Sequence, residues 1–166
     1  MKKYTKWIVG AFCAVALATS AYAAEPVEAW TVSLGGGGST MTDGATPTVF
    51  GLDLSVGRTG KLLLPVEGGI RQSVSYGDGT TLLSTRGYMD FTLFTVAKTV
   101  DVFAGGNVGI SYGNTTPSWE IAPEAGLRLW LKDSVAILAR AEAPFNLDGW
   151  AFKDTVRYFV GFQVKF

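Results

Sequence analysis

The sequence predicts an all-β fold, an eight-stranded antiparallel up-and-down β-barrel, and three observations predict it. Apolar and polar residues alternate along eight stretches of the chain, and this period of two indicates strands and not helices. No helical segment separates these stretches. The connections between them alternate between very short and longer, as expected of an up-and-down barrel whose two rims face different compartments.

The first 23 residues are predicted to be a cleaved signal peptide, outside this fold. Segment 1–23 has a basic start, an apolar run and a small-x-small pattern at residues 21–23. A transmembrane anchor is the alternative, but the apolar run is shorter than the ~20 residues that a membrane-spanning helix needs. Residues 24–166 are therefore expected to form one barrel domain, without internal repeats.

Composition excludes several classes of function. The chain has no histidine, and its single cysteine, Cys13, lies in the predicted signal peptide, so histidine-dependent catalysis, disulfides and zinc sites are not expected. No basic cluster follows Lys6, which argues against nucleic-acid binding. The mean hydropathy of +0.24 is high for a water-soluble domain, yet no later stretch is apolar enough for a membrane helix.

Four expected strands make up the first half of the domain. Residues 29–35 (AWTVSLG) and 48–58 (TVFGLDLSVGR) alternate apolar residues with small or polar ones. Residues 62–74 (LLLPVEGGIRQSV) keep this alternation on both sides of a glycine pair. Residues 86–96 (RGYMDFTLFTV) also alternate, with Leu93 on the apolar face. Each stretch is therefore interpreted as one strand with an apolar and a polar face.

Four more expected strands complete the domain. Residues 100–112 (VDVFAGGNVGISY) and 119–131 (WEIAPEAGLRLWL) set aliphatic residues against Asp, Asn, Glu and Arg. In residues 135–145 (VAILARAEAPF), alanines fill most of the apolar positions. Residues 157–166 (RYFVGFQVKF) have a wholly apolar face up to the last residue. Three prolines fall inside predicted strands, where each removes a ladder hydrogen bond: Pro65, Pro123 and Pro144.

The connections contain no binding motif. The short ones are residues 58–61, 97–99 and 132–134, and the longer ones are residues 35–47, 75–84, 113–118 and 146–150. The glycine run Gly35–Thr40 lacks the ending and the following helix of a phosphate-binding loop, so we expect a flexible surface loop. Residues 76–80 indicate a turn through Asp78-Gly79, without the ligand spacing of an EF-hand.

Charged residues deep in the strands suggest which face points inward. Residues four apart on a strand lie ~13 Å apart, so Glu67 and Arg71 cannot pair with each other and need partners on other strands. We expect a lumen ionic network, in which Arg140 lies opposite or diagonal to Glu124. The predicted network consists of Asp53, Glu67, Arg71, Asp90, Glu120, Glu124, Arg128, Arg140, Glu142 and Arg157. A soluble sheet whose charges simply face water is the alternative.

The apolar face then points outward, towards lipid, which makes the barrel a transmembrane one. Aromatic residues near the strand ends match the girdles that a lipid-facing band requires. Those expected towards the longer connections are Tyr76, Tyr112, Trp119, Phe145 and Phe152, and those towards the short turns are Trp30 and Phe166. Bulky residues are expected inside as well, and they argue against a continuous water path: Phe103, Trp130, Leu138 and Phe159.

The residues resemble the small eight-stranded outer-membrane β-barrels of Gram-negative bacteria, of the OmpA transmembrane-domain and OmpX type. The C-terminal pattern Gly161-x-x-Val164-x-Phe166 looks like the signal read by the barrel-assembly machinery. Residues 123–145 are similar to the penultimate hairpin of that family. The peptidoglycan-binding domain of the longer members has no counterpart in this sequence.

The resemblance implies a non-enzymatic protein of the cell outer membrane with a structural or surface-interaction role. It implies a monomer without a cofactor or metal, and its partners would be outer-membrane lipids, lipopolysaccharide and, during biogenesis, the assembly machinery. Three alternatives stay open: a narrow porin-like channel, a soluble periplasmic barrel with an apolar ligand inside, and acid–base catalysis by carboxylates such as Glu120 and Glu124.

Overall fold

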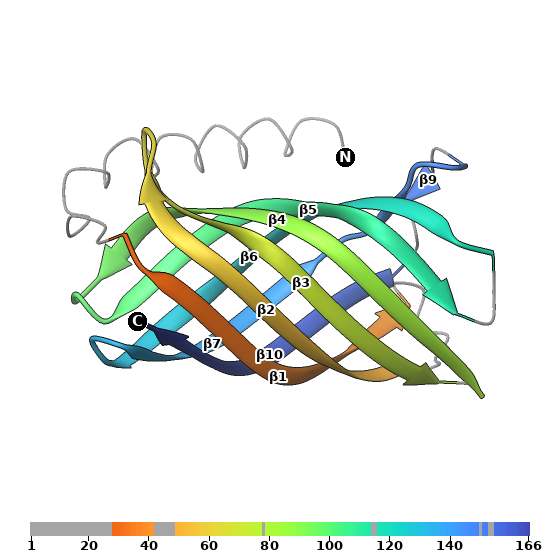
Figure 1. Cartoon of the computed structure of the whole chain (residues 1–166), viewed down its shortest axis with the longest axis horizontal. Coiled ribbons are helices and arrows are strands. Elements are labelled where there is room, and N and C mark those ends of the chain that lie inside the picture. The colour runs from red at the N-terminus through yellow and green to blue at the C-terminus, as the bar shows by residue number, and fades with distance from the viewer. Residues whose placement is uncertain (1–27, 42–48, 78, 114–115, 150, 153–154) are drawn as a thin grey trace, which may run out of the picture.

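The computed structural model describes residues 28–41, 49–77, 79–113, 116–149, 151–152 and 155–166. Every regular element in these ranges is a strand (Figure 1). The long strands are β1 (Trp30–Met41), β2 (Val49–Lys61), β3 (Pro65–Gly77), β4 (Thr80–Val96), β5 (Val100–Gly113), β6 (Ser118–Lys132), β7 (Val135–Glu142) and β10 (Thr155–Lys165). Two short strands, β8 (Phe145–Asn146) and β9 (Ala151–Phe152), lie between β7 and β10. The predicted signal peptide, 1–23, lies outside the described residues.

The eight long strands close into an antiparallel barrel. Sequential strands pair from β1 to β7, β7 pairs with β10, and β10 pairs with β1. At the seam between the first and last strands, the Trp30 N–H donates to Phe166 O at 2.9 Å and the Phe166 N–H donates to Trp30 O at 3.0 Å. The predicted fold class, an eight-stranded antiparallel up-and-down barrel, is confirmed.

The strands run obliquely between two rims (Figure 1). The short-turn rim, as we call it, holds residues 62–64, 97–99 and 133–134, together with Trp30 and Phe166. The opposite long-loop rim holds the ends of β1, β3, β5 and β7. No helix among the described residues is long and apolar enough to cross a membrane.

The flexible loop predicted at Gly35–Thr40 is wrong, because these residues belong to β1. They pair with β10 on one side and, through Ser39, with β2 on the other. Glycine weakens an isolated strand, but it permits another chain segment to come close. A Cβ on Gly35 would collide with Val160 O and would lie 2.7 Å from Phe159 Cζ. The glycines therefore make room for β10 and for a ring in the lumen.

The long connection predicted at residues 75–84 is also wrong. Strand β3 continues to Gly77 and β4 begins at Thr80, so a tight turn joins them. Gly79 adopts the left-handed conformation, with φ of 71°, which glycine accepts without steric cost. The predicted alternation of short and long connections therefore fails here, because the Thr and Leu residues after the turn extend β4.

The turn between β2 and β3 lies further along the chain than predicted. Residues 58–61 belong to β2, and the connection is Leu62–Leu64, which the sequence suggested as the start of a strand. Pro65 is the first residue of β3, a position where the missing N–H is tolerated. The apolar triplet was misleading because alternation cannot distinguish an apolar strand end from an apolar turn.

One predicted strand is interrupted, and another contains a proline. The strand predicted over residues 135–145 breaks at residues 143–144, between β7 and β8, so Pro144 lies in no strand. Pro123 remains inside β6, and its carbonyl accepts from the Ala143 N–H at 3.1 Å. A residue's N–H and C=O point to the same side of a strand. The position where Pro123 lacks an N–H therefore faces residues 143–144, where the neighbouring strand breaks.

The unbroken alternation predicted through Leu93 is wrong as well. The register of β4 against β5 shifts between Thr92 and Phe94, as at a β-bulge. Beyond the shift, Thr95 pairs with Asp101, and the Thr95 hydroxyl donates to Asp101 Oδ1 at 2.7 Å. Beyond the bulge, the side chains that would have pointed outward point inward, and the reverse, in the last residues of β4.

Candidate functional site

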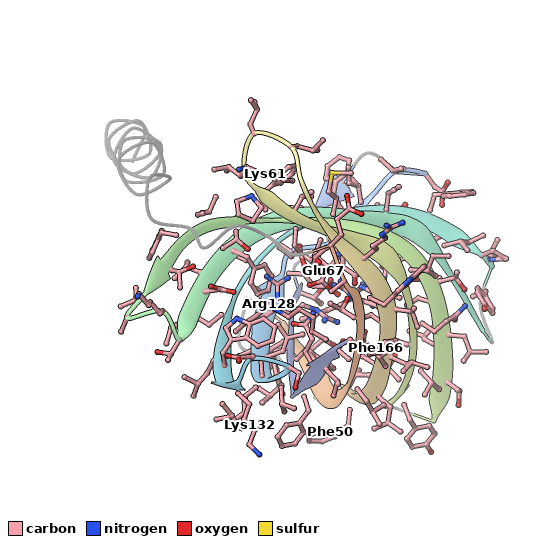
Figure 2. The ribbon with its side chains drawn as sticks, turned by 60° about the vertical axis from the view of Figure 1, so that its left-hand side comes forward. Phe50, Lys61, Glu67, Arg128, Lys132 and Phe166 are labelled. Atoms are coloured by element: carbon pink, nitrogen blue, oxygen red, sulfur yellow. The ribbon has the colours of Figure 1, made fainter. Side chains whose placement is uncertain are left out.

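The lumen of the barrel is polar and its outer wall is apolar. Arg71 and Glu120 are 1% and 0% exposed, whereas Leu34 and Phe50 on the outer face are 58% and 67% exposed. Figure 2 shows Glu67 within the ring of strands. All ten residues of the predicted ionic network point into the lumen; Arg157, whose side chain is 24% exposed, is the least covered.

Two pairs of like-charged neighbours, one of arginines and one of glutamates, face each other across the centre of the lumen. Arg71 and Arg86 are direct partners on β3 and β4, and Glu124 and Glu142 are direct partners on β6 and β7. The Arg71 guanidinium donates to both carboxylate oxygens of Glu124, at 2.7 and 3.3 Å. Arg86 donates to Glu142, and the Asn107 amide donates to both carboxylates, at 3.1 and 2.8 Å. Repulsion within each pair is thus offset by attraction across the barrel.

Two further arginines extend this central cluster. Arg140 Nη2 lies 2.9 Å from Asp53 Oδ1, and its Nε lies 3.8 Å from Glu124 Oε2, which is the diagonal arrangement that the sequence predicts. Arg157 forms a bidentate pair with Glu120, in which Nη2 donates to Oε2 at 2.7 Å. Each carboxylate of the cluster therefore has an arginine partner on another strand.

A second cluster lies nearer the short-turn rim. Glu67 and Asp90 are direct partners on β3 and β4, and Arg128 reaches both from β6. Its Nη2 lies 3.1 Å from Glu67 Oε2 and 3.6 Å from Asp90 Oδ2. Three neutral side chains donate to Glu67 at 2.7 to 2.9 Å: Thr31, Tyr88 and Gln163. The buried carboxylate is therefore well supplied with hydrogen bonds, as a buried charge requires.

Rings fill the space between the clusters. Phe103 and Phe159 are 0% and 4% exposed and, with Leu138, form the buried apolar cluster of the described residues. The Arg128 guanidinium lies 4.2 Å from the centre of the Phe103 ring, and that of Arg140 lies 4.1 Å from the Phe159 ring. These cation–π contacts hold flat guanidinium groups against the rings, so they help to close the lumen.

Glycines make room for those rings. A Cβ on Gly126 would lie 2.5 Å from Phe103 Cζ, and a Cβ on Gly161 would lie 2.7 Å from Phe159 Cζ. A bulky ring therefore lies against a glycine both across the β5–β6 pair, at Phe103 and Gly126, and within β10, at Phe159 and Gly161. The fourth bulky residue predicted inside, Trp130, lies at the short-turn end, where its indole N–H donates to Asp101 Oδ2 at 2.6 Å.

A cavity of about 230 Å³ occupies the half of the lumen next to the long-loop rim. Ser39, Ser73 and Ser84 are among the residues that line it, as are Arg86 and Arg140. Arg86 Nε and Arg140 Nη1 are buried and have no hydrogen-bond partner among the described residues. Such buried donors beside a cavity are suited to bound water.

Sequence reasoning missed several members of the network. Arg86 is the most important, and it was detectable, because it has the same parity as Tyr88 and Asp90 on one strand. Asn107 and Gln163 are polar and lie on the inward face of their strands, but nothing in their local sequence indicates that they bind carboxylates. Local patterning reveals which residues point inward, but it does not reveal which residues lie opposite one another.

The residues of the predicted assembly signal differ in orientation. Gly161 faces the lumen beside Phe159, whereas Val164 and Phe166 are 42% and 71% exposed on the outer face. Of the aromatics predicted near the rims, Tyr76, Trp119, Trp30 and Phe166 are exposed, and the Phe152 side chain lies outside what the structure describes. The described ranges contain no group of three or more His, Cys, Asp or Glu side chains placed to hold a metal ion.

No family model and no curated protein sequence matches the chain. Among solved structures, the chain is similar to Neisserial surface protein A (NspA), with a TM-score of 0.63 and 12% identity, covering 86% of this chain and 100% of that one. The chain has this fold. It is also similar to Ail, the attachment invasion locus protein of Yersinia pestis, with a TM-score of 0.51 and 14% identity, covering 86% of this chain and 100% of that one. The narrower resemblance to the OmpA and OmpX type stays a prediction.

Proposed function

We propose that this protein is a non-enzymatic β-barrel of the Gram-negative outer membrane, with a closed lumen and a structural or surface-interaction role. One observation carries the proposal: buried charges inside an apolar outer wall, the reverse of a water-soluble barrel. An outer wall on which Leu52, Ile70 and Phe162 are each at least 60% exposed is suited to lipid and unsuited to water.

The dimensions support a membrane position. The long strands have 8 to 17 residues, and a tilted membrane strand needs about 9–11. Exposed Trp30 and Phe166 lie at the short-turn rim, and exposed Tyr76 and Trp119 lie towards the long-loop rim. Aromatic residues prefer the two boundaries between lipid and water, so these positions agree with a band of lipid between the rims.

The filled lumen favours a structural or surface role over transport. Eight strands leave room for little more than side chains, and here Phe103, Leu138 and Phe159 fill the interior together with the arginine–carboxylate pairs. The soluble alternative needs an apolar interior for its ligand, and the described residues have the opposite orientation. Acid–base catalysis also loses support, since Glu120 and Glu124 are fully engaged with Arg157 and Arg71.

The proposed partners follow from this position. Outer-membrane lipids would cover the apolar wall, and lipopolysaccharide or another surface ligand would meet the long-loop rim. The barrel-assembly machinery would read Gly161, Val164 and Phe166 during insertion. Every long strand is paired on both sides, so no open edge demands a second copy, which is consistent with a monomer.

Cell fractionation with a gel assay tests the proposal. We expect the protein in the outer-membrane fraction, with a gel mobility that changes on boiling, because a closed barrel resists unfolding by detergent at room temperature. A chain recovered in the soluble periplasm, or one whose mobility is the same before and after boiling, would refute it.

The channel alternative has one observation in its favour, the cavity of about 230 Å³ in the long-loop half of the lumen. Recording from the purified protein in planar lipid bilayers separates the two functions. We expect no reproducible discrete openings, because the rings and ion pairs lie between this cavity and the short-turn rim. Regular openings of constant size would favour the channel.

A further inference from the structure

The hairpin between β2 and β3 leaves the barrel wall at the short-turn rim. On one side, the last backbone hydrogen bond that the described residues make with the N-terminal segment runs from the Thr59 N–H to Ala29 O, at 2.8 Å. On the other side, β3 pairs with β4 only as far as Val66, opposite Phe91. Among the described residues, the hairpin beyond these points pairs only with itself, through Gly60↔Val66 and Lys61↔Pro65. We call residues Lys61–Leu64 the hairpin tip.

The hairpin tip is directed sideways, away from the barrel axis. In Figure 1 the β2–β3 hairpin rises above the outline of the other labelled strands. Figure 2, seen from another side, shows Lys61 on the same hairpin, above the ring of strands. The other turns of this rim, residues 97–99 and 133–134, stay in line with their strands (Figure 1).

The tip displays apolar side chains that nothing in the described structure covers. Leu62 is 64% exposed and Leu63 is 98% exposed, and a hydrogen bond from the Leu62 N–H to Leu64 O, at 3.1 Å, shapes the turn. Turns that face water are normally built from Gly, Pro, Asn, Asp and Ser. A turn of consecutive leucines is therefore better suited to an apolar environment than to water.

The position of the tip indicates what that environment is. The outer face of β3 runs from the tip along Val66 to Ile70, which is 61% exposed, so the leucines continue the apolar wall proposed to face lipid. A hairpin that bends outward at the edge of this wall lies over the adjacent leaflet. Its leucines are then at the depth where headgroups meet acyl chains.

The charge of the rim indicates which lipids would be bound. Every lysine of the described residues lies at or next to the short-turn rim: Lys61, Lys98, Lys132 and Lys165. Lys61 is exposed directly beside the leucines. Arg58 is also exposed, but Glu28 neutralises it at 2.8 Å. A lysine whose stem lies along apolar groups and whose ammonium reaches outward is suited to the phosphate of an anionic lipid.

We propose that the hairpin tip docks on the lipid leaflet at the short-turn rim, with Leu62 and Leu63 inserted at the headgroup boundary and Lys61 bound to the phosphate of an anionic phospholipid. This inference rests on the proposed function, because it requires a barrel that lies in a membrane. The tip would then anchor one side of the barrel at a defined depth in the bilayer.

A fluorescent probe at the tip tests the inference. In the full chain with Cys13→Ser, Leu63→Cys introduces a single thiol that can carry an environment-sensitive dye. The matched control is Ser134→Cys, in the β6–β7 turn at the same rim. Both labelled proteins are inserted into vesicles of phosphatidylcholine, alone or mixed with phosphatidylglycerol, and into vesicles of lipids brominated near the headgroup.

We expect the dye at position 63 to emit at shorter wavelength than the dye at position 134, and to be quenched by the brominated lipids. Phosphatidylglycerol should increase the shift, and Lys61→Gln should abolish that increase while the shift in neutral vesicles remains. Equal, water-like emission at both positions would overturn the docking, and it would also be the result if the tip bound a protein instead of lipid. A shift that phosphatidylglycerol or Lys61→Gln leaves unchanged would overturn the role of the lysine.

The gel assay on the same vesicles separates the two proposals. A protein that inserts, as judged by a gel mobility that changes on boiling, but whose tip stays in water refutes the docking alone. A protein that never inserts refutes the proposed function, and the docking fails with it.

Discussion

Replacing Arg71 by methionine tests whether the lumen network is truly desolvated. The Arg71 side chain is 2% exposed and lies 2.7 Å from Glu124, and it is also within 4 Å of Asp53 and Glu142. Methionine keeps much of the volume but removes the charge, so it leaves several carboxylates without their shared cation. Unpaired buried carboxylates are costly, and a broken buried pair typically destabilises a protein by about 3–5 kcal/mol.

The remaining contacts of Glu124 reduce the expected loss of stability. A pair of unit charges about 4 Å apart is worth about 4 kcal/mol at an effective dielectric constant of about 20. After Arg71→Met, Glu124 keeps the Asn107 amide at 3.1 Å and Arg140 Nε at 3.8 Å. We therefore expect a loss near the lower end, about 3 kcal/mol in the free energy of unfolding.

The protein offers a matched control in Arg58. Its guanidinium lies 2.8 Å from Glu28, nearly the same separation, but these two side chains are 59% and 71% exposed. Exposed pairs contribute about 0–1 kcal/mol, so Arg58→Met should change stability little. The two sites have nearly the same separation at the closest pair and differ in burial, the property under test, and in the two further carboxylates near Arg71.

Urea unfolding in lipid vesicles, followed by tryptophan fluorescence, measures both variants. Equal slopes against urea concentration would show that the difference is in stability and not in the extent of unfolding. The double variant Arg71→Met/Glu124→Gln should lose less than the sum of its single variants, because it removes both charges of one pair. A loss below about 1 kcal/mol for Arg71→Met, equal to that of the control, would refute the desolvated network.

Three further predictions follow from the packing and from the end of the chain. Phe103→Ala should lower the free energy of unfolding by about 3–5 kcal/mol, measured by the same urea assay, because the ring is fully buried; a loss below 1 kcal/mol would show that the lumen collapses around the gap. Gly126→Ala should destabilise the barrel, since its Cβ would meet the Phe103 ring, whereas Gly87→Ala, whose Cβ approaches nothing nearer than 4.0 Å, should not; equal melting temperatures would contradict this account. Deletion of Phe166 should reduce the yield of assembled barrel in the outer membrane more than the stability of the barrels that do assemble; a normal yield would count against the assembly signal.

The sequence predicted the inward and outward sets well, because parity along a strand depends only on local geometry. Asp53 and Arg71 point inward for the same reason that Leu54 and Ile70 point outward: successive side chains alternate across the sheet. The prediction of inward and outward residues failed beyond Thr92, where a bulge adds one residue to the strand, because no residue there indicates a bulge.

The boundaries of the strands were less predictable. The glycine run from Gly35 has weak strand propensity, yet it is strand because two neighbours hold it and because Phe159 needs its space. Leu62 and Leu63 are strongly apolar, yet they form a turn, because the β2–β3 hairpin extends beyond the ends of the neighbouring strands. In both places the partner strands override the local preference.

By itself, the sequence determined the class of fold, the number of long strands and the face on which each charged residue lies, since all three follow from a period of two and from the connections. Only the closed barrel decided the ionic pairs. Register puts Arg71 beside Arg86 and Glu124 beside Glu142, which local sequence would judge unfavourable, and closure then sets each arginine against a carboxylate of a strand that is not its neighbour. The reason is physical: these attractions act across the width of the lumen. Strands that are not neighbours come that close only when β10 pairs with β1 and closes the barrel.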